Sequence, residues 1–131
     1  MRKVVIDTNI VISAAISPYG NPAKILDMVL DGEIQMYYSD GIMNEYIDVL
    51  SRPRLKIAAN LQFNIIKGLT RVGIRINQTI STFPMPDESD RIFYDTAKDC
   101  GAVLITGNTK HYPTESFIMT PSAFMAMIQN V

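Results

Sequence analysis

The stretch Val4-Val5-Ile6-Asp7-Thr8-Asn9-Ile10-Val11-Ile12 decides the fold of this chain. Its first three residues are apolar and β-branched, a composition that favours a short buried strand. A polar triplet interrupts the pattern, and an apolar run rich in Ile, Val and Ala follows as a helix. A carboxylate at the end of a buried parallel strand points into the crevice where α/β proteins bind ligands. The alternative is that Asp7, Thr8 or Asn9 only caps the helix.

The composition is that of an ordinary globular chain, with 47% hydrophobic residues and both signs of charge. We expect one domain over residues 1–131, because a chain of this length buries about two-thirds of its unfolded surface. Cys100 is the single cysteine, which favours a reducing cytoplasm over a disulfide-bonded secreted domain. Asp7 and Asn9 interrupt the N-terminal apolar run, which argues against a signal peptide, and no run is long enough for a membrane span.

The charge balance restricts how the chain could bind nucleic acid. Twelve basic and thirteen acidic side chains give a formal net charge of −1, whereas proteins that bind mainly by phosphate neutralisation are usually basic. A nucleic-acid role must therefore depend on local basic residues, a metal ion or a partner. The basic cluster of the chain is formed by Arg52, Arg54 and Lys56, which a solvated helix start explains equally well.

Five short apolar runs are predicted to be strands, and helical patterns lie between most of them and after the last. The runs are residues 4–6, 34–38, 74–76, 102–106 and 117–119. Residues 54–72 are expected to form two helical pieces, and residues 77–86, with two prolines, a loop. This alternation predicts parallel βαβ units. The strands that end near residues 6, 38 and 106 should therefore meet at one edge of the sheet, together with the polar residues that follow them.

Four residues are candidates for a site at that edge: Asp7, Glu45, Asp90 and Asn108. Glu45 falls in the second turn of its helix, from where it can lean toward the crevice, and the alternative is a solvated surface glutamate. Asp90 opens a later helix, where Asp87 and Asp90 could both act only as caps. Capping by Asp87 is nevertheless compatible with an inward Asp90.

Three converging carboxylates repel one another, and burying them without compensation is unfavourable. A divalent cation resolves this conflict. Because the set contains carboxylates and neither Cys nor paired His, it suits the hard ions Mg²⁺ and Mn²⁺. Such an ion polarises a phosphoryl oxygen, makes water more acidic and orients in-line attack. The residues therefore point to hydrolysis of a phosphodiester.

Four motifs in order resemble those of the PIN domain, and the resemblance covers essentially the whole chain. They are Val5-Ile6-Asp7-Thr8-Asn9, Ser39-x₅-Glu45, Asp87-x-x-Asp90 and Leu104-Ile105-Thr106-Gly107-Asn108. The segment Thr106-Gly107-Asn108-x-Lys110-His111-Tyr112-Pro113 is particularly similar to PIN-family toxins of bacterial toxin–antitoxin systems, which are related to VapC-type toxins.

The resemblance implies a three-layer α/β/α fold with a parallel sheet of about five strands in the order 3-2-1-4-5. It also implies a metal-dependent endoribonuclease in which Asp7, Glu45 and Asp90 are the acidic residues of the metal site. By the same motifs, the site-orienting residues are Thr8, Asn9 and Thr106.

Asn108 departs from the family pattern, since many PIN nucleases carry a fourth acid at that position. An asparagine can still ligate through its carbonyl, but it removes one negative charge, which favours one firmly bound ion. Lys110 and His111 are candidates for contact with RNA phosphate, together with Arg52 and Arg54. A cognate antitoxin and a homodimer are implied by the resemblance alone.

Two other functions remain open from the sequence. One is a non-catalytic binding module with the PIN fold, which the asparagine at position 108 allows. The other is an aspartate-based phosphatase or receiver-type phosphoryl-transfer domain with Asp7 as nucleophile. Haloacid-dehalogenase-like phosphatases require a second aspartate two positions later, where this chain has Asn9, which counts against that alternative.

Overall fold

The sheet of the computed structural model, which describes residues 1–129, is built from five parallel strands in the order β3-β2-β1-β4-β5. The strands are β1 (Lys3–Ile6), β2 (Gln35–Tyr38), β3 (Ile74–Arg75), β4 (Val103–Ile105) and β5 (Ile118–Met119). The predicted strand order is confirmed, and the predicted bounds differ from these by at most one residue at either end. The expected domain of residues 1–131 ends in two residues, 130–131, that lie outside the described part.

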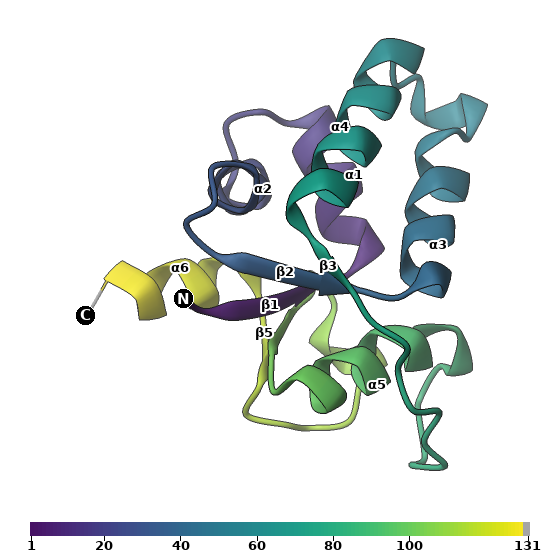
Figure 1. The fold of residues 1–131 in the computed structure, drawn as a ribbon, viewed down its shortest axis with the longest axis vertical. Helices are drawn as coiled ribbons and strands as arrows, with labels where there is room; N and C mark the ends of the chain where they lie inside the picture. Colours follow the sequence, from purple (N-terminus) through teal and green to yellow (C-terminus); the bar gives the residue numbers. More distant parts are fainter. Residues whose placement is uncertain (130–131) are drawn as a thin grey trace.

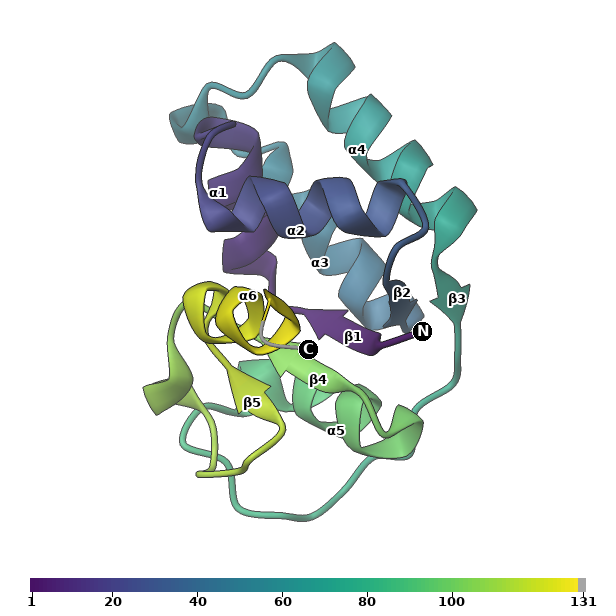
Figure 2. The same cartoon turned by 90° about the vertical axis from the view of Figure 1, so that its left-hand side faces the viewer.

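Helices cover both faces of this sheet, as the three-layer prediction requires. They are α1 (Thr8–Ile16), α2 (Asn21–Leu30), α3 (Asp40–Leu50), α4 (Ala59–Val72), α5 (Arg91–Cys100) and α6 (Pro121–Gln129). In Figure 1, α5 lies below the sheet, whereas the other helices lie above or beside it. Figure 2 shows α6 next to α2 on the side opposite α5. Within residues 1–129, every helix is too short or too polar to cross a membrane.

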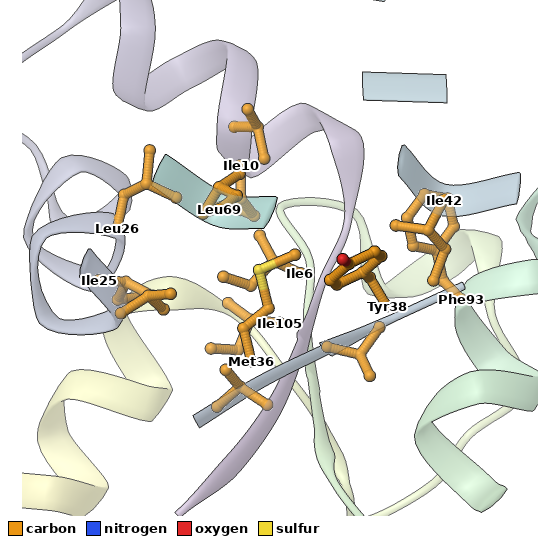
Figure 3. Packing of buried hydrophobic residues seen from close by; sticks show 14 of the residues in the cluster. Ile6, Ile10, Ile25, Leu26, Met36, Tyr38, Ile42, Leu69, Phe93 and Ile105 are labelled. Atoms are coloured by element: carbon orange, nitrogen blue, oxygen red, sulfur yellow. The ribbon is translucent and has the colours of Figure 1, made fainter. Parts of the chain in front are cut away.

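The core forms around β1, the central strand. Val4, Val5 and Ile6 are fully buried, because helices cover both sides of a strand in an all-parallel sheet. Figure 3 shows side chains of the neighbouring strands packed against helices from both layers. Burial of each large aliphatic side chain contributes about 1.5–3 kcal/mol, so the run that opens the sequence also anchors the sheet.

Residues 54–72 form two helical pieces, as predicted. A 3₁₀ turn (Pro53–Leu55) precedes α4, and Lys56 between them has a left-handed backbone with φ of 54°. Pro53 disfavours helical geometry in the residue before it, which ends the helical run at the end of α3. This turn places Arg52 and Arg54 close to the carboxyl edge of the sheet, where they line a cavity described below.

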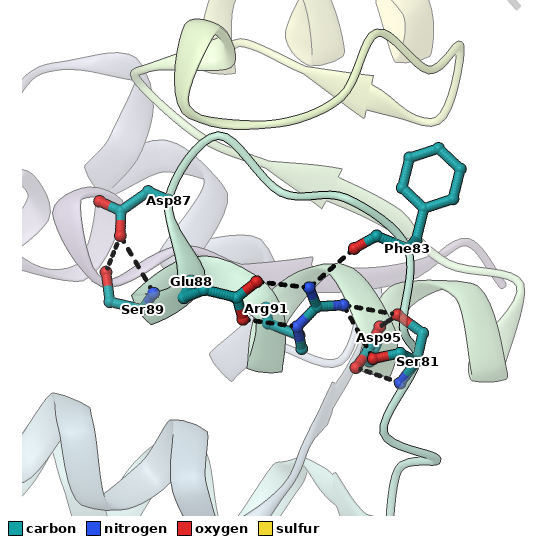
Figure 4. Close-up of polar contacts among 7 residues, drawn as sticks. All are labelled: Ser81, Phe83, Asp87, Glu88, Ser89, Arg91 and Asp95. Atoms are coloured by element: carbon teal, nitrogen blue, oxygen red, sulfur yellow. Dashed lines mark hydrogen bonds and ion pairs between the residues drawn. The ribbon is translucent and has the colours of Figure 1, made fainter.

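The loop of residues 77–86 is irregular, as predicted, and is fastened to α5 (Figure 4). Asp95 is buried and accepts hydrogen bonds from the backbone N–H and the hydroxyl of Ser81, at 2.9 and 2.6 Å. Arg91 donates to the carbonyl oxygens of Ser81 and Phe83 and pairs with Glu88. These bonds tie the loop to the first turns of α5 and so help to fix the position of Asp90.

Candidate active site

Asp7 lies at the carboxyl end of β1, buried at the edge where the parallel strands end. It occupies the N-cap position of α1, yet its side chain makes no capping hydrogen bond. Its Oδ2 instead accepts hydrogen bonds from Thr106 Oγ1 at 2.7 Å and Tyr112 Oη at 2.9 Å. A role limited to capping is therefore wrong for Asp7.

Thr8 and Asn9 make long-range contacts from the first turn of α1. Thr8 Oγ1 donates to Oε2 of Glu45, and Asn9 Oδ1 accepts from the backbone N–H of Gly107 at 3.1 Å. The first contact ties α1 to α3, and the second ties α1 to the loop after β4. Both residues connect elements around the site.

Glu45 is half-buried on α3, so the alternative of a solvated surface glutamate is wrong. Desolvation raises the pKa of its carboxyl group, the hydrogen bond from Thr8 opposes that rise, and the charge of Asp7 adds to it. The next residue, Tyr46, is fully buried and donates its hydroxyl to the carbonyl of Ile6. This bond holds α3 against the end of β1.

Asp90 ends a 3₁₀ turn (Glu88–Asp90) before α5 and makes no capping bond, whereas Asp87 caps that turn through the N–H of Ser89 at 3.0 Å. Oδ2 of Asp90 is buried and has no hydrogen-bond partner. His111 Nδ1 lies 3.4 Å from that oxygen without the alignment of a hydrogen bond. Desolvation, followed by the charges of Asp7 and Asp87, raises the pKa of Asp90 to about 6.

One cavity of about 420 Å³ brings the three predicted carboxylates together. It is lined by Asp7, Glu45 and Asp90, by Thr8 and Asn9, and by Arg52 and Arg54 among others. Asp90 also belongs to a second grouping, because its carboxylate and ligand atoms of Asp87 and His111 lie within 4.8 Å of one another. We favour the cavity as the site, since the half-buried carboxylate of Asp87 already accepts two hydrogen bonds from Ser89.

The loop after β4 holds the remaining predicted residues beside this cavity. The N–H of Asn108 donates to Thr106 Oγ1 at 3.1 Å, and its side-chain Nδ2 lies 2.9 Å from His111 Nε2. Asn108 does not line the cavity itself, so its role as a ligand stays a prediction. Lys110 is exposed and lines a neighbouring cavity of about 450 Å³.

Sequence reasoning missed the two tyrosine hydroxyls at this site. Neither the pattern around Tyr46 nor the segment that contains Tyr112 predicts a hydroxyl contact with the end of β1. Both are buried and both direct their hydroxyl toward the end of β1. The available signal for Tyr112 was an aromatic residue in an otherwise polar loop.

Comparison with known proteins agrees with this geometry. A family model described as "PIN domain" matches residues 3–110. The chain belongs to the PIN domain family. It is also 38% identical over 109 residues to "Uncharacterized protein MJ1680" of Methanocaldococcus jannaschii, a match that covers 81% of this chain and 70% of that protein. PIN domains are generally nucleases that use divalent metals, and proteins of the family commonly bind RNA.

The residues of the cavity fit a hard divalent cation. The buried Oδ2 of Asp90 accepts no hydrogen bond, so it can serve as a metal ligand, and carboxylate oxygens are the ligands that such ions prefer. Desolvation is the main cause of the raised pKa values of Glu45 and Asp90, and repulsion by the charge of Asp7 adds to both. A cation would remove that repulsion.

Proposed function

We propose that this chain is a Mg²⁺- or Mn²⁺-dependent endoribonuclease of the cytoplasm that hydrolyses RNA phosphodiester bonds. The observation that carries the proposal is one cavity lined by Asp7, Glu45 and Asp90, in which one buried carboxylate oxygen has no hydrogen-bond partner within the described residues. Carboxylates kept together in this way reduce stability in the absence of a cation, which argues for a functional reason to retain them.

Asp7, Glu45 and Asp90 would hold the cation. When bound, it supplies positive charge to the reacting phosphate and favours deprotonation of water. Thr8 keeps Glu45 turned into the cavity, and Thr106 fixes the carboxylate of Asp7. The chain thus supplies an oriented set of oxygen donors, and strict orientation accounts for much of the efficiency of such sites.

Arg52 and Arg54 are the proposed contacts for the RNA backbone, because both line the same cavity. Arginine binds phosphate through two parallel N–H bonds. Arg52 already pairs with Asp48 at 3.2 Å, whereas no ion pair engages Arg54 anywhere in residues 1–129. Arg54 is therefore the stronger candidate, and Lys110 and His111 would contact the RNA outside the cavity.

A role as the toxin of a toxin–antitoxin pair, with a cognate antitoxin and a homodimeric state, is the finer part of the proposal. Its support is the similarity of residues 106–113 to PIN-family toxins. The formal net charge of −1 provides no general attraction for RNA, so the proposal places the RNA contacts at the metal site and the local arginines.

Cleavage of a structured RNA in Mn²⁺ tests the catalytic proposal. Wild type should cleave internally and lose activity in EDTA, and Asp7→Asn should lose activity by two or more orders of magnitude while remaining folded by circular dichroism. Asp27→Asn, a change of the same kind on the exposed face of α2, is the matched control and should cleave like wild type.

Equal cleavage by wild type and Asp7→Asn would contradict the assigned site. Absence of cleavage by wild type across RNA classes, with Mn²⁺ binding retained, would favour the non-catalytic binding module. For the toxin role, induced expression of wild type should arrest bacterial growth and Asp7→Asn should not, and growth that continues in both cultures would contradict it.

A further inference from the structure

The hydrogen bonds to the carboxylate of Asp7 all end on one of its two oxygens. Thr106 Oγ1 and Tyr112 Oη both donate to Oδ2, at 2.7 and 2.9 Å. In the described part of the chain, no hydrogen bond reaches Oδ1, and Oδ1 is not among the buried atoms without a partner. Since Asp7 lines the cavity, Oδ1 is the oxygen left available to a ligand.

The direction of these bonds is fixed by the surrounding groups. Thr106 Oγ1 accepts the N–H of Asn108 at 3.1 Å, so its own proton is available for Asp7. Tyr112 is 4% exposed, and its hydroxyl is the donor because an ionised carboxylate oxygen can only accept. Both hydroxyls thus act as donors to the same carboxylate oxygen.

Two converging donors have a consequence for the carboxylate. The terminal torsion of aspartate is broad, so a carboxylate without such bonds samples many orientations. Two bonds to Oδ2 restrict that rotation and leave the lone pairs of Oδ1 free. Groups that orient a metal ligand in this way strongly affect metal affinity.

We propose that Tyr112 is a positioning residue that, with Thr106, holds Asp7 in the orientation that presents Oδ1 to a divalent cation. The inference rests on the proposed function, and Tyr112 would act through Asp7. Packing alone does not account for Tyr112, because phenylalanine would fill the same buried space without placing a hydroxyl against a carboxylate.

The test compares two tyrosine-to-phenylalanine variants by direct Mn²⁺ binding, measured by electron paramagnetic resonance and calorimetry. Tyr112→Phe removes the bond to Asp7 and keeps the ring. Tyr94→Phe is the matched control, because Tyr94 is also buried and also donates to a carboxylate, that of Glu115, at 3.0 Å. Phenylalanine is preferred to alanine because Tyr112 also lines the neighbouring cavity of about 450 Å³.

We expect Tyr112→Phe to weaken Mn²⁺ binding about tenfold and Tyr94→Phe to leave it unchanged. Thermal unfolding in EDTA provides the structural readout, and both variants should lose a similar, small amount of stability there. A loss of Mn²⁺ affinity confined to Tyr112→Phe would support positioning, since a purely structural role would affect both variants alike.

Asp7→Asn separates failure of this inference from failure of the proposed function. If Asp7→Asn abolishes Mn²⁺ binding and Tyr112→Phe binds like wild type, the positioning role is overturned and the metal site stands. If wild type binds no Mn²⁺, or if Asp7→Asn binds it unchanged, the proposed site is overturned and this inference with it.

Discussion

Replacing Asp90 with asparagine should stabilise the metal-free protein at neutral pH while removing its activity. The pKa of Asp90 is raised from 3.8 to about 6, chiefly by desolvation, so the charged form is unfavourable in the folded state. A rise of about two pKa units corresponds to about 3 kcal/mol. Loss of the negative charge at the start of α5 removes up to about 1 kcal/mol. We therefore expect a net gain of about 2 kcal/mol.

The gain depends on pH in a defined direction. Because the pKa of Asp90 is higher in the folded state, the folded protein binds more protons between about pH 4 and pH 6. Wild-type stability should therefore rise, as far as Asp90 contributes, when the pH falls through that window. At pH 5, protonation recovers about 1.4 kcal/mol, roughly half of the electrostatic cost, so the advantage of Asp90→Asn should shrink accordingly.

Urea unfolding in EDTA at pH 7.5 and pH 5 measures this effect. A gain of about 2 kcal/mol raises the urea midpoint by about 1 M, and Asp27→Asn serves as the control on an exposed surface. Saturating Mn²⁺ should stabilise wild type and not Asp90→Asn, because only wild type retains the full ligand set. An Asp90→Asn midpoint equal to or below that of wild type at pH 7.5, or an advantage that stays constant at pH 5, would refute the reasoning.

Three further predictions test the fold and the RNA contact. Gly73→Ala should lower the free energy of unfolding by about 1–3 kcal/mol, because the added Cβ would lie 2.8 Å from a backbone carbonyl oxygen. Gly68→Ala would meet only a flexible leucine methyl and should lower it by less than about 1 kcal/mol. Chemical denaturation compares the two variants, and equal losses of stability would contradict the packing argument. Arg54→Ala should raise KM for RNA and lower the salt dependence of binding by about one unit of slope with kcat retained, and an unchanged KM would remove it from the interface. Asp95→Asn should speed limited proteolysis within residues 77–86, because the buried carboxylate that binds Ser81 is lost; cleavage at the wild-type rate would show that the loop is held by other contacts.

The sequence predicted the sheet well because its information about strands is local. Every residue of the run Val4-Val5-Ile6 is apolar, as expected for a strand that is covered by helices on both faces of the sheet. Strand ends that meet at one edge follow from parallel pairing, so the convergence of Asp7, Glu45 and Asp90 could be expected before any coordinates. The PIN-like motifs supplied the strand order, which the structure confirms.

Local patterns could not predict how those side chains are oriented. Thr106 and Tyr112, which bind Oδ2 of Asp7, are 99 and 105 residues away in sequence, and no periodicity encodes a hydroxyl contact over that distance. The same limit applies to Asn108, predicted as a ligand and found beside His111. The hydrogen bonds from Arg91 that fasten the loop of residues 77–86 to α5 were likewise not predicted.

The sequence by itself determined that an aspartate follows the central strand Val4-Val5-Ile6 and that two further carboxylates should approach it. Only the tertiary structure decided that Asp7 does not cap α1, that Tyr112 joins Thr106 on one of its oxygens, and that Asp90 keeps a buried oxygen without a hydrogen-bond partner. The reason is physical: hydrophobic periodicity fixes which face of an element is buried, whereas the rotation of a carboxylate depends on donors that other elements bring to it.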